Sequence, residues 1–206
     1  MILEAVTVGA MQVNCYVLAE AAGRDAVIID PGADARKIKK VLDTYRLTPR
    51  AVINTHGHYD HIGADNEFGV EVYVHSDDER MLKAPSLNLS ALFAMPFKVT
   101  VPITIVNDRQ MLSLGDIELQ VLHIPGHTPG GMALLLKKPK GTIVFTGDTL
   151  FHHSIGRSDL SGGSGDKLIH AIKEKLLVLP DETKVYPGHG PSSTIGEERS
   201  HNEFLA

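Results

Sequence analysis

The amino-acid sequence predicts an α+β fold in which two stacked β-sheets carry helices on their outer faces. Both halves of the 206-residue chain contain short apolar runs typical of strands, and each half also shows the periodicity of helices. No linker, internal repeat or low-complexity tract is visible between the halves. Length and continuity together indicate a single domain over residues 1–206.

The first half opens with predicted strands near residues 2–8, 12–20 and 26–30, and a Pro-Gly pair breaks the third. Asp34 is expected to cap a helix, because apolar residues recur on one face after it: Ile38, Val41, Leu42 and Tyr45. Pro49 should end this unit. Residues 51–54 should then form a short buried strand.

The middle of the chain is less regular. A short helix is expected from Ile62 and a strand at 71–74. Ser76 and Glu79 match the S-x-x-E form of a capping box, which predicts another short helix. Residues 84–103 are irregular and apolar, so they form either a connection packed on the core or a loop overhanging a pocket.

The second half is dominated by strands, expected near residues 104–106, 111–114, 117–123, 131–136 and 142–146. A helix at 166–178 and a strand at 184–186 should follow. A last helix should begin near Thr194.

Composition excludes several functional classes. The chain is 43% hydrophobic, yet no apolar run approaches the roughly 20 residues of a membrane span. The net charge of −5 gives no basic footprint for nucleic acid. The N-terminus lacks the pattern of a secretion signal, so we expect a cytoplasmic protein with a small-molecule substrate. The single cysteine, Cys15, lies in an apolar stretch and is expected to be buried.

The stretch THGHYDHIG, residues 55–63, crowds metal-ligand side chains directly after an apolar run. If the strand continues through it, His56 and His58 face one point, because residues two apart share a face. A turn into a helix then carries Asp60 and His61 to a neighbouring point. Imidazole and carboxylate together suit zinc, iron or manganese, so the stretch predicts ligands for two adjacent metal ions.

Three later segments supply further ligands in a shared context, in which a predicted strand ends at a glycine-containing turn. They are HIPGHTPGG with His127, FTGDTL with Asp148, and YPGHGP with His189. Glycine permits the tight turns that deliver a side chain to a sheet edge. We therefore expect the strand ends to converge on one site.

These motifs, with IIDPG upstream and STIGEERSHNEF at the end, resemble the metallo-β-lactamase superfamily and, within it, the glyoxalase II-like hydrolases. The resemblance implies a four-layer αββα sandwich with the site at one edge. It also implies two divalent metal ions per chain, with zinc the first expectation and iron or manganese as alternatives. It assigns His56, His58 and His127 to one metal, Asp60, His61 and His189 to the other, and Asp148 to the bridge between them.

Two such metals can share a hydroxide and stabilise an oxyanion, so no serine or cysteine nucleophile is needed. We expect this hydroxide to attack a carbonyl, with Asp60 as a metal ligand that also orients the nucleophile. A thioester suits the site, because a thiolate leaves without a strong general acid. Side chains expected to support the ligands are Asp30, Thr55, Thr128 and Thr149, and purely structural roles are an equal alternative for the three threonines.

Substrate contacts are expected from Arg157, at the position of a basic residue that contacts glutathione in the resembled enzymes, and from His152 and His153. The resembled full-length enzymes carry a C-terminal helical extension, whereas this sequence stops 17 residues after His189 and looks like the compact form.

Other reactions on the same scaffold stay open. His56, His127 and Asp148 alone match the two-His, one-carboxylate triad of a mononuclear non-haem iron persulfide dioxygenase. A lactonase and a phosphodiesterase are further alternatives, and a metal-binding module without turnover is disfavoured by the complete ligand set. The retained Asp60 and the lack of a secretion signal argue against a β-lactamase.

Overall fold

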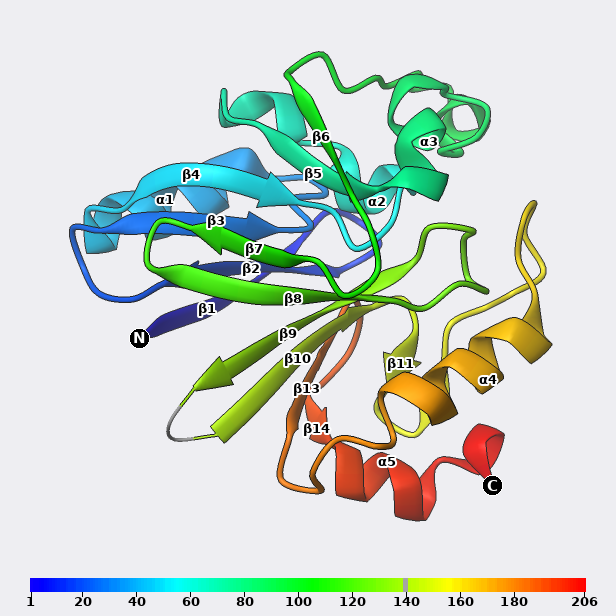
Figure 1. Ribbon diagram of the computed structural model, residues 1–206. Helices are drawn as coiled ribbons and strands as arrows, with labels where there is room; N and C mark the ends of the chain where they lie inside the picture. The colour runs from blue at the N-terminus through cyan, green and yellow to red at the C-terminus, as the bar shows by residue number, and fades with distance from the viewer. Residues whose placement is uncertain (139–140) are drawn as a thin grey trace.

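The computed structural model describes residues 1–138 and 141–206. Two six-stranded sheets stack face to face, and helices lie on the two outer faces (Figure 1). The expected α+β sandwich of four layers is thereby confirmed. None of the helices in the described ranges combines the length and apolar character that a bilayer span demands.

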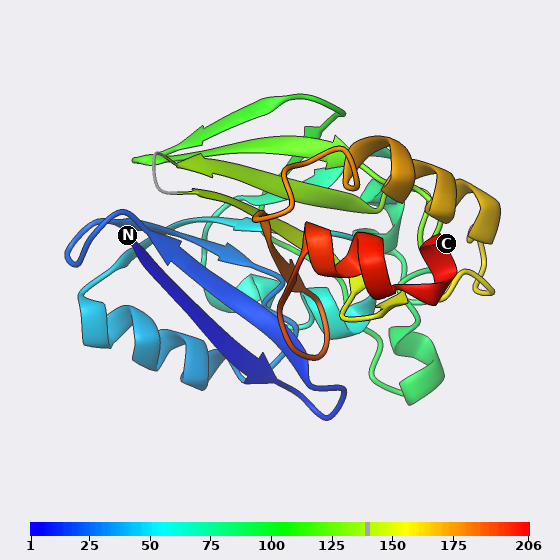
Figure 2. The same ribbon diagram turned by 90° about the horizontal axis from the view of Figure 1, so that it is seen from below.

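The first sheet has the strand order β1-β2-β3-β4-β5-β6. Its strands are β1 (Ile2–Val8), β2 (Val13–Ala19), β3 (Asp25–Ile29), β4 (Thr48–Ile53), β5 (Val72–His75) and β6 (Ile103–Val106). The first three are antiparallel and the last four are parallel to one another. Helix α1 (Ala35–Tyr45) connects β3 to β4 and covers the outer face (Figure 2).

The second sheet has the order β14-β13-β10-β9-β8-β7. Its strands are β7 (Met111–Leu114), β8 (Ile117–His123), β9 (Met132–Lys138), β10 (Gly141–Gly147), β13 (Lys184–Pro187) and β14 (Ser193–Thr194). Only β10 and β13 pair in parallel. A small hairpin of β11 (Leu150–Phe151) and β12 (Ser154–Ile155) follows β10, and α4 (Gly165–Lys175) and α5 (Ile195–His201) cover the outer face.

Three apolar layers hold the sandwich together, and strand alternation sorts side chains between them. In β2, Cys15 and Val17 face α1, whereas Tyr16 and Leu18 face the second sheet. In β9, Leu134 faces the first sheet and its neighbours face α4 and α5. Strands buried on both faces read as continuous apolar runs, which explains why these segments lacked a polar alternation.

Several local predictions were wrong. Asp34 occupies the position before α1, but its carboxylate accepts from Gly9 N–H and binds Lys37 instead of capping the helix. Helix α2 (Tyr59–Ile62) ends where a helix was expected to begin, and a 3₁₀ turn (Asp65–Glu67) follows. Ser76 starts a 3₁₀ turn and makes no capping bond to α3 (Glu79–Lys83); its hydroxyl donates to Asn107.

The apolar segment 84–103 combines the two roles that were left open. Val99 is buried in the layer under α1, and Phe97 packs beside it. Around the 3₁₀ turn Ser90–Phe93, by contrast, Leu92 is 78% exposed and Met95 is 54% exposed. One end of the segment thus packs on the core, and the other stands out over the protein surface.

Candidate metal centre

The predicted ligand residues sit on four segments, each of which follows a strand; Asp60 and His61 belong to the short helix α2, and the others belong to loops. The segments come after β4, β8, β10 and β13, and they meet at one edge of the sandwich. His56 and His58 belong to an irregular stretch after β4 and not to a continued strand, so the expected reason for their shared direction was wrong. Their rings nevertheless lie 4.9 Å apart, because the loop turns between them.

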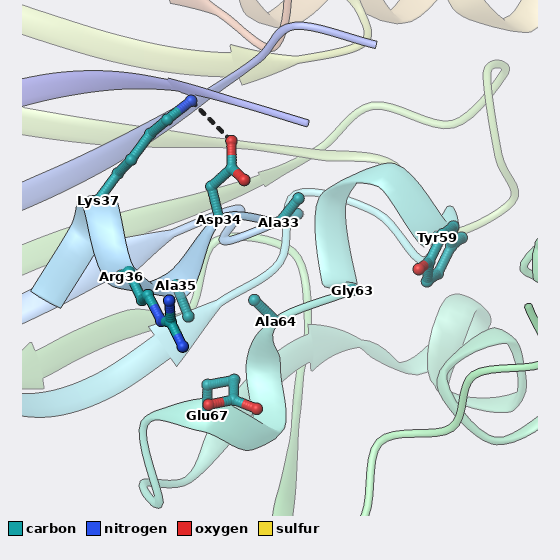
Figure 3. Close-up of a pocket in the computed structure, with 10 residues that line it drawn as sticks. Ala33, Asp34, Ala35, Arg36, Lys37, Tyr59, Gly63, Ala64 and Glu67 are labelled. Atoms are coloured by element: carbon teal, nitrogen blue, oxygen red, sulfur yellow. Dashed lines mark hydrogen bonds and ion pairs between the residues drawn. The ribbon is translucent and has the colours of Figure 1, made fainter. Parts of the chain in front are cut away.

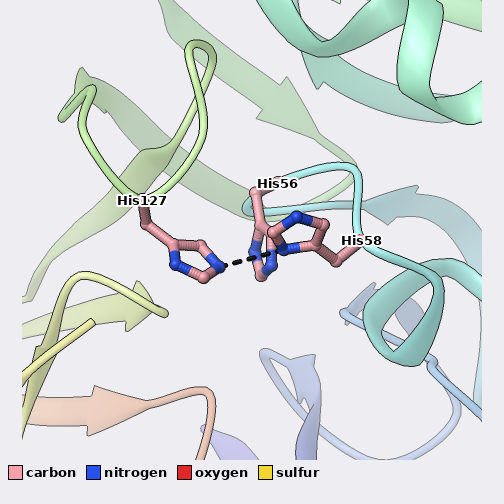
Figure 4. A group of neighbouring side chains, drawn as sticks. All are labelled: His56, His58 and His127. Atoms are coloured by element: carbon pink, nitrogen blue, oxygen red, sulfur yellow. Dashed lines mark hydrogen bonds between the residues drawn. The ribbon is translucent and has the colours of Figure 1, made fainter. Parts of the chain in front are cut away.

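The structure brings all seven predicted side chains together in overlapping groups. Within each group the ligand atoms lie within 4.8 Å of one another: His56, His58 and His127; His56, His61 and Asp148; Asp60, His61 and His189. Figure 4 shows the first group, in which His58 Nδ1 and His127 Nε2 are 3.0 Å apart. His61 Nε2 lies 3.3 Å from Asp148 Oδ1, which links the groups.

Acceptors hold the outer nitrogens of the imidazoles. His127 Nδ1–H donates to the carbonyl of Arg157 at 2.7 Å, and His189 Nδ1–H donates to that of Met11 at 3.0 Å. Each bond fixes one tautomer and leaves the Nε2 lone pair aimed into the group. The residues present fit a cation, since His56 Nε2 and Asp148 Oδ1 are buried there and make no hydrogen bond.

Asp30 supports the ligands from beneath. One of its oxygens accepts from Thr55 N–H at 2.7 Å, and the other accepts from the Thr55 hydroxyl at 2.7 Å and from His61 Nδ1–H at 3.0 Å. The Thr55 hydroxyl is also 3.2 Å from His56 Nδ1. Asp30 and Thr55 therefore contact two ligand imidazoles, directly and in relay.

Asp78 is a supporting residue that the sequence reasoning missed. Its carboxylate is buried and accepts from Gly57 N–H, from the Thr128 hydroxyl at 2.7 Å and from Gly130 N–H. It thus ties the loop of His58 to that of His127. Thr128 supports the centre through this hydrogen bond, whereas the Thr149 hydroxyl donates to the carbonyl of Thr146 at 2.6 Å.

Contacts between the two sheets hold the loop of His189. Tyr16 donates from its hydroxyl to the carbonyl of Pro187 at 2.6 Å, and Asn14 donates to the carbonyls of Pro187 and Gly190. The backbones of Val13 and His189 form an isolated bridge. The first residues of β2 thereby position His189, a predicted ligand that follows them by more than 170 residues in sequence.

The electrostatics of the cluster favour a cation. Burial and the neighbouring histidines lower the pKa of His56, and burial followed by His127 lowers the pKa of His58 to about 4. Burial opposes ionisation of Asp60 and Asp148, but His61, His189 and the other nearby histidines together outweigh it and keep the pKa of both carboxyls below the usual value. The same carboxylates raise the pKa of His61 and His189 above the usual value in spite of burial, so a bound cation would take the place of the protons on these two imidazoles.

Three predicted substrate contacts lie outside this cluster. Arg157 pairs through two nitrogens with Asp159 at 2.8 Å, and only its carbonyl reaches a ligand histidine. His152 and His153 stack on each other in the turn between β11 and β12, where both face Glu197.

Two hollows open beside the cluster. One of about 150 Å³ is lined by Asp60 together with Met11, Tyr59 and Met95. The other, of about 250 Å³, is lined by His58, Arg80 and leucines that include Leu87. A third hollow, of about 540 Å³, lies between the start of α1 and α2 and contains none of the seven residues (Figure 3).

A comparison with known protein families identifies the superfamily of this chain. The family model described as the metallo-beta-lactamase superfamily matches residues 8–189, a range that includes all seven clustered side chains. The chain belongs to this superfamily. Curated members similar to it include an uncharacterised protein of Mycobacterium tuberculosis, 44% identical over 100% of this chain and 98% of that protein.

Two other members carry functional names. The probable metallo-hydrolase YqgX of Bacillus subtilis is 36% identical over 96% of this chain and 94% of its own length. The hydroxyacylglutathione hydrolase GloC of Haemophilus influenzae is 34% identical over 98% of this chain and 97% of its own.

Solved structures of the superfamily share the architecture over nearly the full chain. BLEG-1, a B3 metallo-beta-lactamase, superposes with a TM-score of 0.92 at 39% identity and full coverage of both chains. TTHA1623 in a di-iron-bound form gives 0.84 at 36% identity, covering 98% of this chain and 100% of that one. ETHE1 from Myxococcus xanthus gives 0.75 at 30% identity, covering 98% and 84%. This superfamily member is therefore a metal-dependent hydrolase by family.

Proposed function

We propose that the chain is a binuclear metallohydrolase that cleaves a thioester of the S-2-hydroxyacylglutathione class. The observation that carries this proposal is the convergence of seven ligand-type side chains in overlapping groups. One group has three imidazoles, and the others bring carboxylates to the same place. A single metal ion would leave part of this buried polar set without a partner, which is costly.

His56, His58 and His127 would hold one metal and Asp60, His61 and His189 the other, with Asp148 between them. Zinc suits these ligands first, and iron or manganese suits them next. When bound, such a pair lowers the pKa of water to about 7 and polarises a carbonyl oxygen. The side chains of Asp30, Thr55 and Asp78 would keep the ligands in position through their hydrogen bonds to the ligand histidines and to the loops that carry them.

Within the described residues, the cluster offers a carboxylate to orient the attacking water and no strong general acid for the leaving group. Asp60 Oδ2 lies 3.5 Å from His189 Nε2 and also faces the hollow lined by Met95. The other clustered imidazoles are directed at the metal positions. A thiolate leaves unaided because the pKa of a thiol is near 8.5, so a thioester suits the site better than an amide.

GloC supports the glutathione assignment, because the match covers 98% of this chain and 97% of that hydrolase. The hollow beside His58 also contains a positively charged side chain, which could pair with a carboxylate of the substrate. Arg80 lines it and, among the described residues, forms no ion pair, whereas Arg157 is already paired with Asp159. We propose Arg80 as a contact of the glutathione part, and place the enzyme in the cytoplasm, where glutathione thioesters are a reasonable substrate.

The test is hydrolysis of S-D-lactoylglutathione by purified protein, with metal analysis and an oxygen electrode in parallel. We expect about two metal ions per chain, thioester cleavage and no oxygen uptake. Arg80→Ala should raise KM with little change in kcat, and His170→Ala, a change at an exposed surface histidine, should leave both unchanged. A lactone and a β-lactam serve as competing substrates. Faster turnover of either would replace the thioester assignment.

A persulfide dioxygenase is the second candidate, favoured by the similarity to ETHE1. It would use His56, His127 and Asp148 with one iron. His127 Nε2 lies 3.7 Å from Asp148 Oδ2, so the geometry accommodates that triad also. Oxygen consumption with glutathione persulfide, one iron per chain and no thioester cleavage would establish it in place of the hydrolase.

A further inference from the structure

A second group of metal-ligand side chains lies on the surface, outside the candidate centre. His152 Nε2 and His153 Nε2 are each 3.2 Å from the same oxygen, Oε1 of Glu197. The two rings stack with centroids 3.9 Å apart. The side chains are 36%, 41% and 39% exposed, so the point on which their three ligand atoms converge is open to solvent.

Buried contacts beneath the group fix its geometry. His153 N–H donates to Glu198 Oε2 at 2.9 Å, and the same oxygen accepts from Asn202 at 2.8 Å. Asn202 also donates to the carbonyl of Ser154 at 3.0 Å. Glu198 is fully buried. The turn that carries the two histidines is therefore locked onto α5, which carries Glu197.

The carboxylate of Glu197 faces the two histidines and does not cap the start of its own helix. Glu197 is the third residue of α5 after the N-cap Thr194, where a capping-box glutamate would bend back to the N-cap backbone. Its backbone N–H does bond to the Thr194 hydroxyl, at 3.2 Å. Its carboxylate is turned instead toward the histidine pair, although a lone surface carboxylate–histidine contact stabilises a protein little.

We propose that His152, His153 and Glu197 form a surface site for one divalent transition-metal ion. Two imidazoles and one carboxylate suit Zn²⁺, Ni²⁺ or Cu²⁺, and do not suit Mg²⁺ or Ca²⁺, which prefer oxygen ligands. Three protein ligands leave outer positions for water. The ring of His201 lies 5.7 Å from that of His153, but His201 is outside the group and its Nδ1 bonds to the carbonyl of Glu197.

The site differs from the candidate centre in depth and membership. None of its members belongs to the seven clustered residues, and His56 and His61 of that cluster are fully or almost fully buried. It gives His152 and His153 a role other than contact with substrate. The ion would reside on the surface and take no part in hydrolysis.

The experiment is a Zn²⁺ titration by calorimetry on protein that already holds the metal with which it was purified. We expect wild-type protein to take up one ion per chain more than His152→Ala and Glu197→Gln, or to bind it about tenfold or more tightly. His170→Ala is the matched control, because it removes an exposed helical histidine that faces Glu174. Circular dichroism checks that each variant is folded.

A spectroscopic readout distinguishes the site from general surface binding. Added Cu²⁺ should give an electron paramagnetic resonance spectrum with nitrogen couplings from two imidazoles, and His152→Ala should lose one of them. Excess Mg²⁺ should not displace the ion. Equal stoichiometry and affinity in wild type, His152→Ala and Glu197→Gln would overturn the proposal, as would a Cu²⁺ spectrum unchanged by His152→Ala.

Discussion

Replacement of Gly188 by alanine would test whether the space between Asp148 and His61 is needed for metal binding. A Cβ atom at residue 188 would lie 2.3 Å from Asp148 Oδ1 and 2.8 Å from His61 Cε1. Ordinary contact begins at 3.4 Å, so Asp148 would have to move by about 1.1 Å. The backbone of Gly188 cannot retreat easily, because its N–H bonds to Gly147 and its carbonyl accepts from Asn14 N–H.

A displacement of this size in a predicted metal ligand should cause a large functional loss with a modest loss of stability. We expect kcat/KM for thioester cleavage to fall on the order of 100-fold, with less metal per chain. Crowding of this kind costs about 1–3 kcal/mol of folding free energy. Metal analysis, steady-state kinetics and thermal unfolding measure the three quantities on the same preparation.

Gly190→Ala is the control in the same loop. A Cβ there meets no atom within 4 Å, and the only penalty is the positive φ of 76°. The reasoning is refuted if Gly188→Ala keeps the wild-type metal content and a rate within about threefold. It is also refuted if Gly190→Ala loses metal to the same extent, since backbone distortion would then account for both.

Three further changes probe the supporting residues. Asp78→Ala leaves three buried donors without an acceptor, so urea unfolding should show a loss of about 3 kcal/mol or more; wild-type stability would contradict its proposed tie between loops. Asp30→Asn should weaken metal binding about 10- to 100-fold in a chelator competition, because His61 loses its carboxylate acceptor; unchanged affinity would exclude that support. Burial, and then His123, lowers the pKa of His75 from 6.5 to about 4, so the unfolded chain binds more protons between these values. Stability should therefore fall as the pH drops from 6.5 toward 4, and His75→Asn should remove about 1–2 kcal/mol of that loss; equal pH dependence in denaturant titrations would disprove it.

The grouping of the seven side chains could be predicted from the sequence because each of them is recognisable from its immediate neighbours. Each is a polar residue in a short motif that follows an apolar strand. His127, Asp148 and His189 all follow strands of the second sheet in this way. Because these strands end at the same edge of the sandwich, the side chains that follow them are brought together. The sheet layering was also predictable, since runs such as AVIID mark strands buried on both faces.

Other features depend on partners that are distant in sequence. Asp78 bonds to groups 21, 50 and 52 residues away, and its neighbours Ser76 and Glu79 matched a capping pattern that tertiary contacts override. The hairpin of β11 and β12 has strands of two residues, too short for any periodicity. The grouping of His152 with Glu197 joins residues 45 apart and had no local signature.

The bridge between Val13 and His189 has a consequence for synthesis in the cell. Met11 and His189 are 178 residues apart, so the contact between them closes a long loop and can form only after most of the chain has been synthesised. While the nascent chain is still emerging from the ribosome, the imidazoles of residues 56 to 61 are already outside the exit tunnel without that last histidine. Only after residue 189 has been synthesised can the strands at the start of the chain contact the last predicted ligand, which makes completion of the ion-binding site a late step of folding.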